Sequence, residues 1–237
     1  MERKHFLKSL LVGAVTAPAL LSACGKDEVT PDASGSTTTG GTTGSCSAAP
    51  TETEGPFPTK QPASYVRSDI RDGKTGHLLT AKVTITNTNN GCAALAGALV
   101  DIWHCDAEGN YSEYGGTQMQ STNYQAVHFL RGRQTTDATG LVTFTSIFPG
   151  WYSGRATHIH VHVYSASGQS LKVTQIAFPE GSGSAVALVN GYAKGLTGYT
   201  PNAQDNVFSD GVSLELATVT GNTTDGFQLS ISLGVPA

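Results

Sequence analysis

The feature that most constrains the fold is the strict alternation of imidazole and aliphatic side chains at residues 158–163, which read His-Ile-His-Val-His-Val. Successive side chains of a β-strand point to opposite faces of a sheet. A strand here places three imidazoles on one face and Ile159, Val161 and Val163 on the other. Two imidazoles at positions i and i+2 can chelate one ion from a single strand, and the alternative is a polar face that binds no metal.

Short strand-like stretches recur along the chain, and no long segment has helical periodicity. Turn signals rich in Gly, Pro, Asn and Asp separate them. This pattern predicts an all-β fold, a single β-sandwich domain of mixed or antiparallel strands. The expected strands cover residues 82–87, 98–103, 141–147, 156–164, 171–178 and 227–233.

Two segments have no clear strand pattern. Residues 109–136 have little regularity, and a loop of that length in a compact domain is usually functional, so we expect long active-site loops there. The part from residue 179 onward is rich in Gly, Ala and Ser until alternation returns near its end. It could close the sandwich or form a surface for a partner.

The first 45 residues differ in composition from the rest. Residues 1–23 combine a basic start with an apolar run and end in Leu-Ser-Ala before Cys24, which is typical of a bacterial lipoprotein signal peptide. The apolar run is shorter than the roughly 20 residues that span a bilayer. We therefore expect cleavage before Cys24, a lipid on its sulfur, and export to the bacterial cell envelope, at the outer membrane or cell surface. The general secretion and twin-arginine routes both remain open.

Residues 24–45 are dominated by Gly, Ser and Thr, a composition that stays a flexible coil. They predict a tether between the lipid anchor and a folded domain at 46–237. That domain is long enough for a single β-rich unit.

Charge argues against one class of partner. The chain has 14 Lys and Arg against 18 Asp and Glu, a formal net charge of −4, and no basic cluster. Binding to nucleic acid needs concentrated positive charge, so we expect no nucleic-acid partner.

Three cysteines follow Cys24 in the chain: Cys46, Cys92 and Cys105. An oxidising compartment favours one disulfide with one thiol left over. The sequence leaves the pairing open.

Several motifs surround the imidazole run in a fixed order. They are Thr-Glu-Gly-Pro-Phe at 53–57, Asp-Ile-Trp-His-Cys-Asp at 101–106, Gly-Asn-Tyr at 109–111, Pro-Gly-Trp-Tyr at 149–152, Arg-Ala-Thr-His-Ile-His at 155–160 and Thr-Gln-Ile at 174–176. Together they resemble the intradiol ring-cleaving dioxygenases, the family that contains protocatechuate 3,4-dioxygenase and catechol 1,2-dioxygenase. The resemblance covers about residues 46–178. It is strongest to the secreted branch of the family.

The resemblance implies that Tyr111, Tyr152, His158 and His160 are the ligands of a non-haem iron(III) ion. Phenolate oxygen is a hard anionic donor and imidazole a borderline one, a mixture that suits iron(III) better than zinc or copper(I). For an arbitrary tyrosine, the alternative is a core aromatic ring with a satisfied hydroxyl.

The resemblance also implies roles for two catalytic residues beyond the ligands. Arg155 would stabilise negative charge on the substrate ring, because its charge is permanent and its donors lie in one plane. The alternative for Arg155 is a structural ion pair. Gln175 would hold Arg155 or a substrate oxygen in place. We expect His162 to support or pack against the site rather than bind metal, and Phe57 to line the pocket.

The activity implied is cleavage of a catechol-type ring between its two hydroxyl-bearing carbons, with O2, to give a muconate-type diacid. The alternative is a non-enzymatic β-sandwich at the cell surface that binds a ligand or another metal. Catechol, protocatechuate and hydroxyquinol differ by one small group, and motif spacing does not distinguish among them. Nor does it give the oligomeric state.

Overall fold

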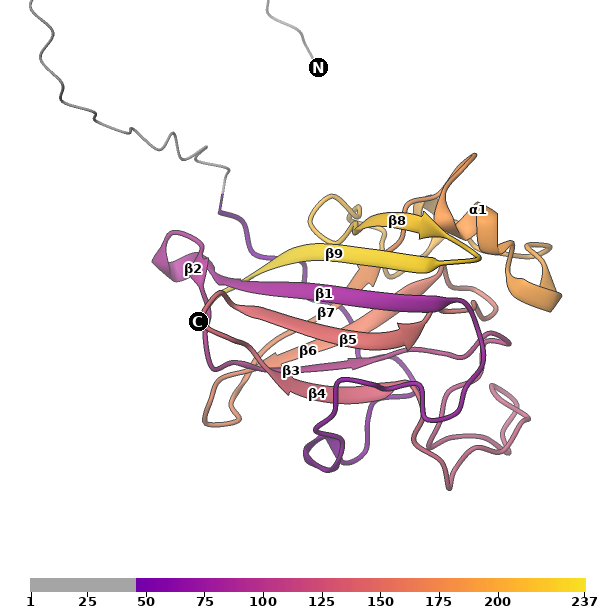
Figure 1. The fold of residues 1–237 in the computed structure, drawn as a ribbon, viewed down its shortest axis with the longest axis horizontal. Coiled ribbons are helices and arrows are strands. Elements are labelled where there is room, and N and C mark those ends of the chain that lie inside the picture. Colours follow the sequence, from indigo (N-terminus) through magenta and orange to yellow (C-terminus); the bar gives the residue numbers. More distant parts are fainter. Residues whose placement is uncertain (1–45) are drawn as a thin grey trace, which may run out of the picture. The chain divides into compact units, whose positions relative to one another are not determined.

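The computed structural model describes residues 46–237. The expected signal peptide at 1–23, the lipid site at Cys24 and the tether at 24–45 lie outside the described residues. Within residues 46–237, no helix combines the length and the apolar character that crossing a membrane would require. Two β-sheets account for most of the regular structure, as the alternating patterns predicted (Figure 1).

The first sheet has five strands arranged around β1 (Leu78–Asn87). Strand β9 (Gly226–Val235) pairs with β1 in parallel, and β5 (Leu141–Ile147) pairs with it antiparallel on the other edge (Figure 1). The short β2 (Ala93–Ala94) pairs with the end of β1, and β8 (Thr218–Asn222) pairs with β9. The part of the chain after residue 179 therefore completes this sheet.

The second sheet has four antiparallel strands in the order β4-β3-β6-β7. Their bounds are Arg131–Thr135 for β4, Leu99–Trp103 for β3, His158–Tyr164 for β6 and Ser170–Ala177 for β7. The helices between strands are short. They are α1 (Ala185–Val189) and four 3-10 turns, η1 (Pro62–Ser64), η2 (Thr88–Asn90), η3 (Tyr192–Lys194) and η4 (Asn202–Gln204).

The apolar face of β6 packs into the core between the sheets. Ile159, Val161 and Val163 are at most 1% exposed and belong to one cluster with the apolar side chains of β1, β5 and β9. The predicted alternation of β6 is thus confirmed. Its second face, which carries the imidazoles, is buried as well, because loops cover it. A strand buried on both faces holds polar side chains away from water.

The structure differs from the sequence expectation at several places. Strand β4 lies inside residues 109–136, which were expected to be loop throughout. Strand β1 begins four residues earlier than expected, and β2 and β8 were not expected. The sequence did not predict β4 because Arg-Gly-Arg-Gln-Thr has no apolar alternation. Arg131 and Gly132 are nevertheless buried.

The disulfide joins Cys46 to Cys92, with Cα atoms 5.5 Å apart, and Cys105 is a buried free thiol. This settles the pairing that the sequence left open. The bond fastens the start of the described chain next to the end of β1. Ala49 N reinforces it by donating to Gly234 O of β9, at 2.9 Å.

Candidate metal centre and active site

Strand β6 brings the imidazoles of His158 and His160 together beneath the loops. Their Nε2 atoms lie 3.1 Å apart, and the residues are 2% and 1% exposed. His158 Nδ1 lies 2.6 Å from Ala156 O. A carbonyl only accepts, so Nδ1 carries the proton and Nε2 presents a lone pair. Burial, and then the nearby Arg155 charge, lowers the pKa of His158 to about 3, which keeps the ring neutral.

The ring of His160 is held by stacking. It lies parallel to the indole of Trp103, with ring centroids 4.8 Å apart and an interplanar angle of 2°. Its Nδ1 is buried and has no hydrogen-bond partner among the described residues. Burial, together with its neighbours His158 and Arg155, lowers the pKa of His160 well below the ordinary value. Stacking on Trp103 therefore sets the plane of the imidazole, and Nε2 is the nitrogen that faces His158 and Tyr111.

Tyr111 reaches the same point from the loop between β3 and β4. Its Oη lies 3.3 Å from Nε2 of His158 and 3.3 Å from Nε2 of His160. The side chain is fully buried, and burial raises its pKa well above 10. Gln120 fixes the backbone at this position, because its amide both accepts from Tyr111 N at 2.6 Å and donates to Tyr111 O at 2.8 Å.

These three atoms fit a metal ion. They form a triangle with sides of 3.1–3.3 Å, and atoms that bind one ion at about 2.0–2.2 Å are themselves about 3 Å apart. The phenol has one proton and can donate to only one imidazole at a time, so without a cation the cluster is short of donors. No set of three His, Cys, Asp or Glu in the described part of the chain offers a metal site, so this one depends on tyrosine.

Tyr152 lies at the edge of this triangle. Its ring meets the ring of Tyr111 edge-on with centroids 5.6 Å apart, and that of His158 at 5.8 Å. Its Oη lies 3.4 Å from Arg155 Nη1, which is also 3.3 Å from His158 Nε2. Unlike Tyr111 it is only partly buried. We call Tyr111, Tyr152, His158 and His160 the Tyr–His cluster.

Arg155 is tied to two partners besides the cluster. Its Nη2 donates to Gln175 Oε1 at 2.5 Å, and Gln175 Nε2 donates to Thr53 O at 2.9 Å. Its Nε donates to both carboxylate oxygens of Asp205, at 3.0 and 2.9 Å. The ion pair that was the alternative for Arg155 thus exists, with a partner the sequence analysis missed. No local pattern around Asp205 signals it.

Two other buried imidazoles, those of His162 and His104, have hydrogen-bond partners outside the triangle. His162 Nε2 lies 2.7 Å from Ser170 Oγ, and its Nδ1 lies 2.9 Å from Glu54 Oε1. His104 Nε2 lies 2.7 Å from Ser146 Oγ, and its Nδ1 pairs with the carbonyl of Cys105. Neither side chain has a free nitrogen directed at the cluster.

Phe57 covers the cluster on the side of the long loop. Its ring stacks on Tyr111 with centroids 4.7 Å apart and meets Tyr152 edge-on at 6.2 Å. Phe57 also lines a hollow of about 490 Å³, together with Lys60 and with residues of the 113–125 loop such as Tyr114. This places Phe57 between the cluster and an open, mostly apolar surface.

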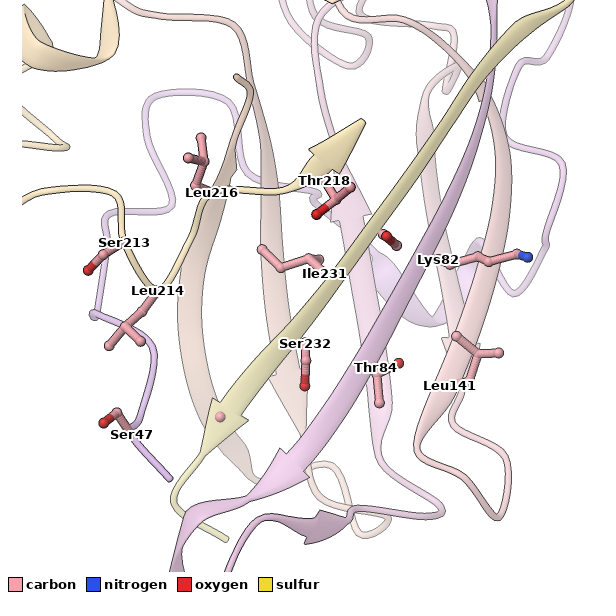
Figure 2. A pocket seen from close by; sticks show the side chains of 12 residues that line it. Ser47, Lys82, Thr84, Leu141, Ser213, Leu214, Leu216, Thr218, Ile231 and Ser232 are labelled. Atoms are coloured by element: carbon pink, nitrogen blue, oxygen red, sulfur yellow. The ribbon is translucent and has the colours of Figure 1, made fainter. Parts of the chain in front are cut away.

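A second hollow, of about 510 Å³, lies away from the cluster. Figure 2 shows it over β1 and β9, with Lys82, Thr84, Ile231 and Ser232 among its lining side chains. No member of the Tyr–His cluster lines it.

A family model and solved structures both match this chain, and both are of dioxygenases. The family model described as "Dioxygenase" matches residues 54–217, which is 164 of 237 residues. A search of curated proteins returned no match in sequence. Among solved structures, the chain is similar to an intradiol ring-cleavage dioxygenase from Tetranychus urticae. The two are 26% identical with a TM-score of 0.70, over 81% of this chain and 96% of that one.

Two more distant structures share the fold. One is the dioxygenase domain of a dioxygenase–carbohydrate-binding protein fusion from Streptomyces sp. SirexAA-E, 24% identical with a TM-score of 0.56 over 79% of this chain and 97% of that chain. The other is catechol 1,2-dioxygenase from Pseudomonas arvilla C-1, 21% identical with a TM-score of 0.51 over 79% and 62%.

Proposed function

Because this chain belongs to the intradiol ring-cleavage dioxygenases, we propose that its Tyr–His cluster binds iron(III) and that its substrate is a catechol-type aromatic. The observation that carries the proposal is the convergence of Tyr111 Oη with the Nε2 atoms of His158 and His160. A phenolate and two neutral imidazoles form a donor set suited to a hard trivalent ion. Such an ion would remove the phenol proton that burial otherwise retains. A non-enzymatic β-sandwich is set aside, because the family is one of enzymes.

Bound iron(III) would supply a Lewis acid that orients both substrate oxygens and prepares the ring for O2. The protein's own groups do the rest. Tyr152, the partly exposed member of the cluster, would be deprotonated beside the ion as Tyr111 would, and its phenolate Oη would accept a proton from a substrate hydroxyl. Its neighbour Arg155 Nη1 would then stabilise negative charge on the ring, because the guanidinium stays charged throughout.

The surroundings of the cluster keep this chemistry in place. Trp103 fixes the plane of His160 by stacking, and Phe57 covers Tyr111. Tyr111 and both imidazoles are almost fully buried, so water is excluded from the donor atoms. Electrostatic interactions are stronger in such a site than in water.

The visible spectrum of purified protein tests the proposal. Iron(III) bound to phenolate gives a charge-transfer band, and we expect this band to change when catechol is added. Oxygen uptake with a panel of dihydroxy and trihydroxy aromatics would then identify the preferred substrate. A colourless protein that binds zinc in place of iron and consumes no oxygen would overturn the proposal.

We also propose that the enzyme is a lipoprotein of the bacterial cell envelope, anchored at Cys24, with residues 24–45 as the tether to the domain at 46–237. The support is the composition of residues 1–45 alone. In cells given a labelled fatty acid, we expect label on the wild-type protein and none on Cys24→Ser. Equal labelling of both would contradict the proposal.

A further inference from the structure

The guanidinium of Arg155 is held on two sides, and its third side faces the Tyr–His cluster. Asp205 accepts from Nε with both oxygens, and Gln175 accepts from Nη2. Only Nη1 is left, and it faces Tyr152 Oη at 3.4 Å and His158 Nε2 at 3.3 Å. The orientation of the one nitrogen that faces the cluster is therefore set by the contacts of the others.

Asp205 is itself held rigidly. It is 2% exposed, and its carboxylate also accepts from Ala156 N at 2.8 Å and Val207 N at 2.9 Å. It follows the turn η4, where Asn202 N donates to both oxygens of Glu180, at 3.0 Å each. A carboxylate with this many fixed donors does not swing with the side chain it holds.

The contact from Ala156 N adds a further constraint. Ala156 is the residue after Arg155 and lies two residues before His158, so one Oδ2 atom binds both the side chain of Arg155 and the backbone that leads into β6. The carbonyl oxygen of Ala156 in turn accepts from His158 Nδ1. Asp205 thereby links the position of the guanidinium to the start of the strand that carries the imidazoles.

We infer that Asp205 is a positioning residue for ring cleavage, which acts by directing Nη1 of Arg155 at Tyr152. The inference rests on the proposed function of the Tyr–His cluster. Without the carboxylate, the guanidinium can rotate about its last side-chain bonds, and Nη1 loses its fixed place. Asp205 touches none of the four proposed metal ligands, so the loss affects the reaction and leaves metal binding intact.

The test is Asp205→Asn in the full chain, with iron content measured alongside turnover. Mutation of a residue that orients an active-site side chain from outside commonly lowers activity by about 10–100-fold. We expect kcat of Asp205→Asn to fall by that factor at unchanged iron content. The charge-transfer band should shift, because Nη1 of Arg155 lies beside Tyr152 Oη. In metal-free, isotopically labelled protein, the Nε–H resonance of Arg155 should lose its protection from solvent exchange.

The chain offers a matched control in a second buried ion pair. Asp101 on β3 is also 2% exposed and accepts from Arg133 Nε and Nη2, at 2.5 and 2.7 Å. We expect Asp101→Asn to lower stability comparably, with kcat and the band position retained. Equal losses of kcat in the two variants would mean that Asp205 is merely structural, and would overturn the inference.

Two further variants test the inference, and the first of them does so even where Asp205→Asn folds poorly. Arg155→Lys keeps the charge but has a single nitrogen for all partners, so we expect a loss of kcat like that of Asp205→Asn; full turnover would overturn the inference. In an Arg155→Met background, adding Asp205→Asn should cost nothing further, because it acts through Arg155. A further drop would overturn the inference. Wild-type protein that binds no iron would instead overturn the proposed function, and this inference with it.

Discussion

The Nε2 atoms of His158 and His160 lie 3.1 Å apart on one strand, and both rings are neutral because burial lowers their pKa. Two residues of one strand form this pair, so its geometry depends on the regularity of β6 more than on any loop. Tyr111 completes the triangle from outside the strand.

The first prediction concerns metal content. His158→Ala or His160→Ala should each weaken iron binding, because each removes a donor atom. The loss of affinity should exceed the roughly 10–100-fold that is typical when a residue that only orients a metal ligand is mutated. Iron per protein, measured by elemental analysis, checks this. His162→Ala is the control, since that ring lies on the same face of β6 but pairs with Ser170 and should keep its iron. Unchanged iron in His158→Ala would contradict the assignment.

The second prediction separates binding from turnover. Tyr152→Phe should keep iron and lose activity by a factor on the order of 10²–10⁴, because the phenolate oxygen of Tyr152 is the proposed proton acceptor. Oxygen uptake and iron content are measured on the same sample. Tyr114→Phe is the matched control, since Tyr114 Oη donates to Pro58 O at 2.7 Å, away from the cluster. Full turnover in Tyr152→Phe would contradict the role.

The third prediction concerns the disulfide. Cys46 and Cys92 are 46 residues apart, and closing a loop of that size stabilises a protein by about 3–4 kcal/mol. The double variant Cys46→Ser, Cys92→Ser should lose about this much free energy of unfolding, measured with denaturant. A reducing agent should destabilise the wild type and a Cys105→Ala control alike, because burial raises the pKa of the Cys105 thiol and keeps it unreactive. Wild-type stability unaffected by reduction would contradict the prediction.

The fourth prediction is a pH dependence of stability at Glu52. Burial, and then the charges of Glu215, Asp210 and Asp205 against that of Arg155, raises the pKa of Glu52 to about 7. The ordinary value near 4.5 applies to the unfolded chain. The folded protein therefore retains a proton that the unfolded chain releases, so stability is greatest below the unfolded value and falls as pH rises toward 7.

Glu52→Gln should remove this part of the decline and make the protein more stable than wild type above the folded pKa. Denaturation at several pH values between about 4.5 and 8 measures it. Glu108→Gln, at an exposed position, is the control and should leave the slope unchanged. Parallel pH profiles for wild type and Glu52→Gln would refute the prediction.

The strands could be predicted from the sequence where one face is apolar. Strand β5 has the predicted bounds, because Val142 and Phe144 alternate with threonines along it. Strand β4 could not be predicted, because its burial is achieved by polar contacts. Arg131 donates to the carbonyls of Phe57 and Ser112, and Gly132 packs so closely on Ile70 that a Cβ would lie 2.4 Å from it.

In the candidate site, too, some residues could be predicted from the sequence and others could not. His158, His160 and Arg155 could be named because they lie in one short motif, and the structure places them together. Asp205 is 50 residues from Arg155, in a segment without periodicity or motif. Only the folding of the chain after β7 brings it to the guanidinium. Contacts of this kind depend on tertiary structure, and a single sequence gives no sign of them.

The parallel pairing of β1 with β9 has a consequence for how the protein is made. Leu79 pairs with Phe227, and 227 − 79 gives a separation of 148 residues. One edge of β1 therefore stays unpaired until the ribosome has synthesised almost all of the domain. Pairings between residues so distant in sequence also form slowly. The nascent chain would need to be kept from aggregating until β9 arrives, because a polypeptide stopped before residue 226 would leave the backbone groups along that edge of β1 unpaired.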